Sequence, residues 1–241
     1  MAAKIEIDFA GVPQIKGKFL SIDVEKETLG RFRRKAVWKK DADYIFTTID
    51  GKYALSQVIK HIIPPTRIIA DFMLYDYALD RFRNRKTWID QMRALSSSGI
   101  TKIVALDFSN YYETPDPIVA ANMYHNLTRL AEAQAVGMTV MLNWNLITEG
   151  YHPVYLEKFP HDLGTIYMDD NHSIGSAILE RETDKWREIL DNFTVQSVIV
   201  SSAKKSLDGH GALLRTLSRA AVPYVLIPSQ TPLLFLGKST K

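Results

Sequence analysis

Cysteine is absent from this chain of 241 residues. Without thiols there is no disulfide, no cysteine nucleophile, no iron–sulfur cluster and no thiolate zinc site. Long hydrophobic runs are missing too, because no stretch approaches the roughly 20 apolar residues that span a bilayer. The N-terminal stretch MAAKIEIDFAGV has no continuous apolar segment of the secretory kind. We therefore expect a cytoplasmic location and no membrane partner.

Several catalytic signatures are also missing. The sequence has no glycine-rich phosphate loop of the P-loop or Rossmann type and no G-x-S-x-G nucleophile elbow of a serine hydrolase. Its histidines are scattered, and no two of them have the spacing of metal ligands. The cofactor is therefore left open by the sequence, with magnesium as the one candidate.

Short runs rich in β-branched residues recur from Tyr44 onward, and each is followed by a helical pattern. The runs are YIFTTID, RIIADF, KIVALDF, TVMLNWN, TIYMDD, SVIVSS and PYVLIPS. Apolar runs without alternation are typical of parallel strands covered on both faces, and helices between such strands form right-handed crossovers. We predict an α/β chain with a (β/α) barrel-like fold, complete or one strand short, in preference to an open doubly wound sheet. An eighth strand is expected either at LLFLG, residues 233–237, or near the N-terminus.

The predicted helices have recognisable start and stop residues and apolar faces. The longest is expected to be capped by Asp116, to have Pro117 at its first position and to end before Gly137. Its buried face is expected to hold Met123 and Leu127, and that of the helix before it Trp88, Met92 and Leu95.

The first 43 residues look different from the rest. Apolar residues alternate in KIEIDF and again in FLSIDVE, which predicts an antiparallel β ribbon laid against the main body. The basic stretch 31–40 then acts as a connector, and residues 44–241 form the repeated β/α units. Because no repeat, linker or low-complexity tract divides the chain, residues 1–241 are predicted to be a single domain.

Basic residues gather in two stretches, RFRRKAVWKK at 31–40 and RFRNRK at 81–86, although the net charge is only +3. Both are interleaved with aromatic residues, a pattern that suits phosphate contacts and base stacking. The alternative is a solvated face whose charged heads shield apolar stems. The predicted nucleic-acid-binding residues are Arg31, Arg33, Arg34, Lys35, Arg81, Arg83 and Arg85.

Polar residues stand where the predicted strands end. In a parallel barrel these ends meet on one rim, where sites are built. The predicted catalytic residues are Asp71, Asp107, Asn143 and Asp169, and the acidic pair Asp169 and Asp170 is the candidate magnesium site. Each aspartate taken alone also suits a helix cap. For Asp107 a cap is not needed, because Asp116 already serves the following helix.

The segment DFSNYYETPDPIVAANMYHNLTRLAEAQAVGMTVMLNWN resembles a family of uncharacterised proteins found in bacteriophages, prophages and other mobile elements. The features that carry the resemblance are an Asp-Phe-Ser strand end, a tyrosine, a proline-opened helix with Asn and Tyr, and a glycine before a strand that ends in tryptophan. Those residues are Asp107, Phe108, Ser109, Tyr111 or Tyr112, Pro117, Asn122, Tyr124, Gly137 and Trp144. The family's basic Tyr-Arg-Asn-Arg run is replaced here by YHNLTR, which keeps Tyr124, Asn126 and Arg129 in looser spacing. The resemblance implies a phage-type origin and one α/β domain, and it implies no reaction.

These observations favour a phage- or mobile-element protein associated with nucleic acid, and an enzyme acting on DNA or nucleotides through acids at strand ends. The alternative is a non-catalytic module that binds a host or phage protein on a barrel-like scaffold. A lyase or glycosidase ranks third, since it needs a pair of carboxylates about 5–9 Å apart.

Overall fold

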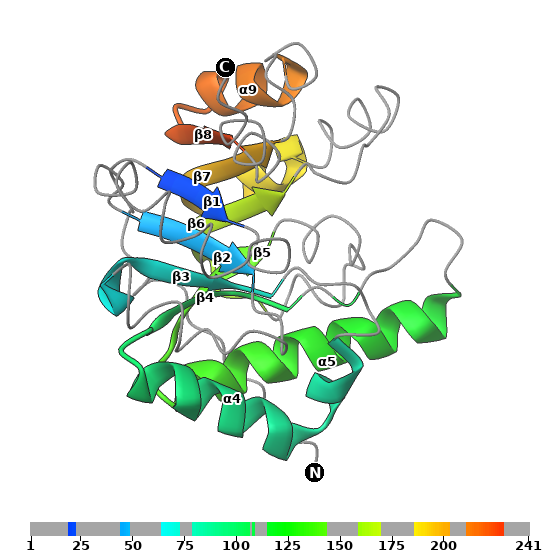
Figure 1. Cartoon of the computed structure of the whole chain (residues 1–241). Helices are drawn as coiled ribbons and strands as arrows, with labels where there is room; N and C mark the ends of the chain where they lie inside the picture. The colour runs from blue at the N-terminus through cyan, green and yellow to red at the C-terminus, as the bar shows by residue number, and fades with distance from the viewer. Residues whose placement is uncertain are drawn as a thin grey trace, which may run out of the picture.

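A computed structural model describes residues 19–22, 44–48, 64–72, 79–106, 108, 115–143, 159–169, 186–202 and 211–228. Within these ranges the chain is an α/β protein built on one sheet (Figure 1). The strands are β1 (Phe19–Ile22), β2 (Tyr44–Thr48), β3 (Ile68–Asp71), β4 (Lys102–Val104), β5 (Thr139–Asn143), β6 (Asp162–Asp169), β7 (Thr194–Ser202) and β8 (Tyr224–Pro228).

The eight described strands pair in parallel and in chain order, from β1 to β8. The sheet curls, so that β1 and β8, at the two ends of this order, come close to each other (Figure 1). A doubly wound sheet reverses its strand order at a switch point, and this sheet does not. The seven predicted runs are all strands, and the parallel direction predicted for them is confirmed.

The eighth strand is β1, from the N-terminal region, which is one of the two places predicted for it, and the antiparallel ribbon stays a prediction. Phe19 is the register partner of Tyr44, and β1 runs parallel to β2 within the main sheet. The other half of the ribbon, residues 4–9, lies outside the described residues, as does LLFLG. Alternation in a sequence shows that one face of a strand is covered, but it does not show the direction of the neighbouring strand.

The described helices are η2 (Pro65–Arg67), η3 (Asp80–Arg83), α4 (Arg85–Ser97), α5 (Asp116–Ala135) and α9 (Gly211–Arg219), and residues 186–192 are also helical. Asn84 caps α4, because its side chain accepts from the Thr87 N–H at 3.1 Å. For α5 the residue before the helix is Pro115, so Asp116 is the first helical residue and not the cap. Gly137, with φ of 87°, follows the end of α5 as predicted, since glycine tolerates this left-handed backbone.

Helices α4 and α5 pack against each other and lie along β3, β4 and β5 (Figure 1). Trp88 of α4 is fully buried, and its ring meets Phe72 and Phe82 edge-on at 5.0 and 5.4 Å between centroids. Its indole N–H donates to the backbone oxygen of Arg129 on α5, 2.7 Å away. The buried faces predicted for these two helices are confirmed by Met92, Leu95, Met123 and Leu127.

Among the helices of the described ranges, none has the length and apolar character needed to cross a membrane. The cytoplasmic location stays a prediction.

Candidate functional site

One face of the sheet collects the buried polar side chains of the strands. Register partners in a parallel pair stand side by side, with their side chains on the same face. Asn143 of β5 is the partner of Tyr167 of β6, and Thr165 of β6 is the partner of Ser197 of β7. Because Thr165 and Tyr167 are two residues apart on one strand, all four lie on the same face. The Thr165 and Ser197 hydroxyls are hydrogen-bonded at 2.8 Å in the buried interior.

Asp71 belongs to this polar face as well. Ile69 of β3 is the partner of Lys102 of β4, which is in turn the partner of Thr139 of β5. Asp71 is two residues beyond Ile69, and Asn143 is four beyond Thr139, so the period of two places both on the face defined by Lys102. We call this the polar face, defined by Asp71, Asn143, Thr165, Tyr167 and Ser197. The same register also places the buried apolar residues Ile69, Met141 and Ile199 on it.

The opposite face is apolar and is covered by helices. The register positions that alternate with the polar face are buried aliphatic residues, namely Ala70, Ile103, Val140, Leu142, Ile166 and Val198. Phe72 follows Asp71 directly, and its ring contacts Trp88 of α4. Successive side chains of an extended chain point to opposite faces, so Asp71 points away from α4.

Asp71 and Asn143 both stand at the carboxyl ends of their strands, where sites of parallel α/β folds are built. Asp71 is 3% exposed and Asn143 is fully buried. Only β4 separates β3 from β5, so the axes of these two strands are about 10 Å apart. The structure therefore brings two of the four predicted catalytic residues to one face and one edge of the sheet.

The other predicted acids are described only in part. Asp169 is the last residue of β6, two positions beyond Tyr167, and its register partner is Ser201 of β7. That register position belongs to the polar face, but its side chain is not described. Asp107 and Asp170 lie outside the described residues. Within the described ranges no cluster of three histidine or acidic residues is arranged to hold a metal ion, and the magnesium site at Asp169 and Asp170 stays a prediction.

The three arginines of the second basic stretch make contacts within the protein. The Arg81 guanidinium carbon lies 4.6 Å from the centre of the Phe82 ring. Arg83 donates to Asp80 and to Asn122, both at 3.0 Å. Arg85 pairs with Glu132 at 2.8 Å.

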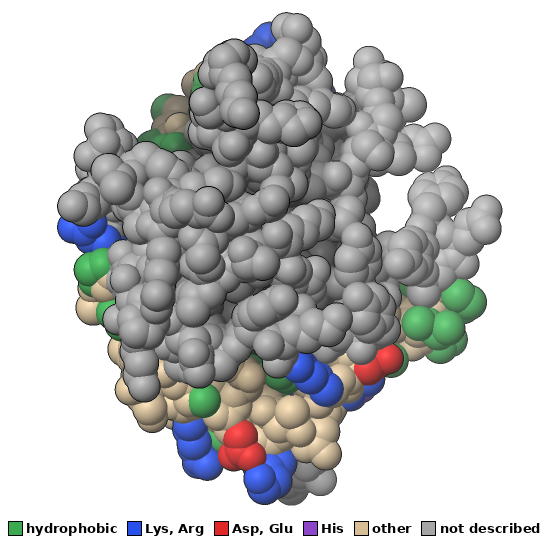
Figure 2. Space-filling view, in the orientation of Figure 1, with side chains coloured by type: hydrophobic (Ala, Val, Ile, Leu, Met, Phe, Trp, Pro, Cys, Tyr) green, Lys and Arg blue, Asp and Glu red, His purple; other side chains and the backbone are tan. Residues whose placement is uncertain are grey.

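The surface beside this stretch has mixed charge. In Figure 2 the lysine and arginine side chains near α4 are interspersed with acidic ones, and Lys86 pairs with Asp90. Of the predicted nucleic-acid-binding residues in the first stretch, Arg31, Arg33, Arg34 and Lys35 lie outside the described residues. Nucleic-acid binding by either stretch stays a prediction.

Sequence reasoning missed a group of buried polar residues on α5. Asn122, Asn126 and Arg129 are 6%, 1% and 6% exposed. Their spacing of four and three residues follows the same stripe of the helix as the buried residues Met123 and Leu127. This regular spacing was the available signal, since a polar residue on a buried helical stripe requires a partner.

His125 lies next to this group, and its ring centre is 6.2 Å from that of Phe108 and 5.9 Å from that of Tyr124. Its Nδ1 atom is buried and has no hydrogen-bond partner in the described part of the chain. Burial lowers the pKa of His125 below its ordinary value, and the cations Arg83 and Arg129 lower it further. The ring is therefore neutral at physiological pH.

No family model matches this chain, and no curated protein matches it. The solved structures that are distantly similar to this chain include two assigned to the short-chain dehydrogenases/reductases. One is a protein from Sinorhizobium meliloti 1021 assigned to the short-chain dehydrogenases/reductases, at 11% identity over 90% of this chain and 97% of the other, with a TM-score of 0.28. The second is a short-chain dehydrogenase from Burkholderia cenocepacia J2315 in complex with NADP, at 13% identity over 93% of this chain and 94% of the other, with a TM-score of 0.27. TM-scores this low carry no argument about this chain.

Proposed function

We propose that this chain is a (β/α)-barrel enzyme that acts on nucleotides or DNA, with its site on the polar face at the carboxyl ends of the strands. The observation that carries the proposal is the placement of Asp71. This carboxyl group is buried at a strand end, on the face turned away from α4, together with the fully buried Asn143. Burying an ionisable group costs free energy, and a buried carboxyl group at a strand end is a common feature of active sites.

The barrel itself is part of the proposal. The consecutive parallel order and the approach of β1 to β8 are the features expected of a sheet that closes on itself. In a closed barrel the face covered by helices is the outer one, and α4 covers the face opposite Asp71. The polar face then lines the barrel interior, and its carboxyl-end edge forms the rim.

The proposed chemistry is general acid–base catalysis. Asp71 exchanges a proton with the substrate or with an attacking water, a role that contributes about 10²- to 10⁴-fold to a rate. The amide of Asn143 donates to the negative charge that develops in the transition state. A substrate with phosphate groups is supported by the two basic stretches and by a pI of about 8.9. The phage-type origin implied by the resemblance agrees with such a substrate and stays a prediction.

The experiment is an activity screen on the full chain with nucleotides, single-stranded DNA and double-stranded DNA, with and without Mg²⁺. Asp71→Asn keeps the shape of the side chain and removes its proton-transfer capacity, so it should abolish turnover. Asp90→Asn, at an exposed acid of α4 paired with Lys86, is the matched control and should leave turnover unchanged. Turnover that survives Asp71→Asn would refute the assignment of the site. No turnover on any substrate would refute the enzyme and favour the protein-binding scaffold.

A further inference from the structure

The chain after β4 is held by a side chain of α5. The Ala105 N–H still donates to Met141 of β5, at 2.9 Å, and so belongs to the sheet. The Phe108 N–H instead donates to the side-chain oxygen of Asn126, at 3.2 Å in the buried interior. A strand that leaves its sheet has backbone groups without ladder partners, and a buried one needs an acceptor from elsewhere. Asn126 supplies that acceptor.

The ring of Phe108 is held from a second element. The guanidinium carbon of Arg83, from η3, lies 4.3 Å from the ring centre. The same guanidinium donates to Asn122 of α5 at 3.0 Å. Phe108, which follows β4, is therefore held by two contacts. Its backbone N–H is bound by Asn126 of α5, and its ring is covered by Arg83 of η3.

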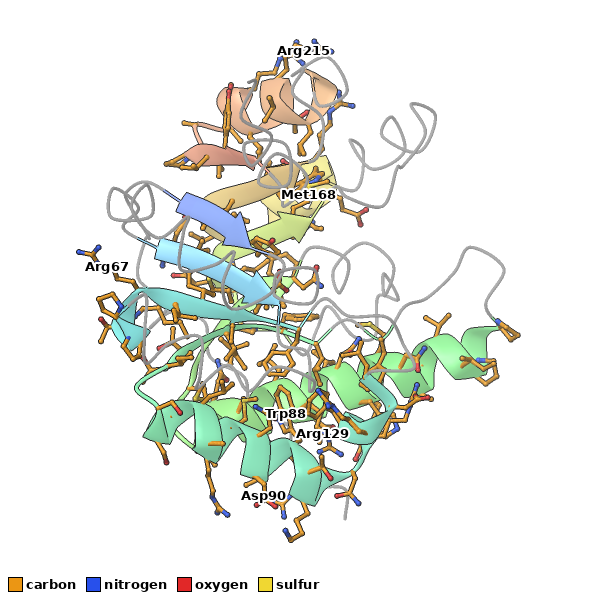
Figure 3. All side chains as sticks on the ribbon, viewed as in Figure 1. Arg67, Trp88, Asp90, Arg129, Met168 and Arg215 are labelled. Carbon is orange, nitrogen blue, oxygen red and sulfur yellow. The ribbon has the colours of Figure 1, made fainter. Side chains whose placement is uncertain are left out.

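Arg129 ties these two holding elements together. Its Nε donates to the backbone oxygen of Phe82 and its Nη2 to that of Arg83, both at 2.8 Å. Figure 3 shows Arg129 next to Trp88, between α4 and α5. Because Arg129 joins η3 to α5 in this way, Arg83 and Asn126 contact Phe108 from two elements that are bonded to each other.

We infer that Arg83 and Asn126 are positioning residues of the candidate site. They hold the exit of β4 at the edge where Asp71 and Asn143 lie on the two neighbouring strands. An Asp-Phe pair stands at the end of β3 and another follows β4 after a gap of two residues, and in both cases the phenylalanine is anchored on the helical side. The positioning role of Arg83 and Asn126 rests on the proposed function, whereas their contacts with Phe108 are independent of it.

Amide hydrogen exchange, measured by NMR on the full chain, tests the hydrogen bond between the Phe108 N–H and Asn126. Asn126→Leu removes the acceptor and should speed exchange of the Phe108 amide about tenfold, as expected for the loss of one hydrogen bond. Asn126→Asp keeps an acceptor oxygen and should stay near the wild-type rate. Asn192→Leu, at an exposed asparagine, is the control. An unchanged Phe108 rate in Asn126→Leu, or the same rate in the Asp and Leu variants, would overturn the inference.

A second variant covers the case in which Asn126→Leu does not fold. Arg83→Lys keeps the charge but loses the planar group that lies over Phe108, and it should also speed exchange at Phe108. No change in this variant would overturn the part assigned to Arg83.

The activity screen separates positioning from simple packing. Asn126→Leu should lower kcat with little change in KM, and Asn126→Asp should restore it. If Asp71→Asn abolishes turnover and Asn126→Leu does not lower it, the positioning role is overturned and the enzyme stands. If the wild type has no turnover, the proposed function fails and the positioning role fails with it, while the exchange result still reports the contact itself.

Discussion

Arg85, which is exposed, and Arg129, which is buried, both form an ion pair with the carboxylate of Glu132. Arg85 Nε donates to one oxygen at 2.8 Å, and Arg129 Nη1 donates to the other. The Arg85 side chain is 75% exposed, whereas that of Arg129 is 7% exposed. The two ion pairs to one acceptor therefore differ in burial, and Arg129 in addition donates to the backbone oxygens of Phe82 and Arg83.

Arg129→Met should destabilise the fold by about 3 kcal/mol, because removing one partner of a buried pair leaves polar groups unsatisfied. The groups concerned are Glu132 and the backbone oxygens of Phe82 and Arg83. Arg85→Gln should cost less than about 0.5 kcal/mol, since exposed ion pairs contribute little. Urea unfolding of the two variants provides the comparison. Equal losses would show that Arg129 does not hold η3 to α5.

His125 should make stability depend on pH. Because burial and the two arginines lower its pKa in the folded chain, the unfolded chain binds more protons just below pH 6.5. Stability should therefore fall as the pH falls through that value towards the lowered pKa. His125→Gln removes this group and should flatten the dependence between about pH 7.5 and about pH 5. A wild type and variant with the same slope, measured by denaturant unfolding across the range, would contradict the lowered pKa of His125.

The strands were predictable because each is a local signal. An uninterrupted β-branched run such as RIIADF or SVIVSS shows a strand covered on both faces, whatever lies next to it. The parallel direction followed from the helical patterns between the runs. The position of β1 was not predictable in this way, because the direction of its neighbour is set by contacts distant in sequence.

The site was predictable at the level of strand ends. Asp71 and Asn143 were found because a polar residue after an apolar run stands at the rim of a parallel sheet. The roles of Asn126 and Arg83 were not found, since a hydrogen bond to Phe108 and a guanidinium over its ring depend on how α5 and η3 meet. Arginines in the stretch RFRNRK suggested phosphate contacts, and their contacts with Asp80, Asn122 and Glu132 appear only in the folded chain.

Nucleic-acid binding should show a salt dependence. Neutralising phosphates releases counterions, so log affinity for duplex DNA falls with log salt by about 0.9 per phosphate contacted. With two or three contacts from each basic stretch, the slope should be about −4 to −5. The double variant Arg81→Gln and Arg85→Gln should reduce it by about two if both side chains contact phosphate. Arg83 is left intact because of its contact with Phe108. A flat dependence, or no association with DNA or RNA at low salt, would contradict nucleic-acid binding.

If the carboxyl ends of the strands form one acidic site, the carboxylate of Asp107 lies near that of Asp71, and a crystal structure measures the distance between them. β3 and β4 are neighbours about 5 Å apart, and Asp107 is three residues beyond Val104, the position beside Asp71, so we expect the two carboxylates within about 15 Å of each other on the polar face. A separation above about 15 Å, or an Asp107 carboxylate turned towards α4, would contradict the shared site.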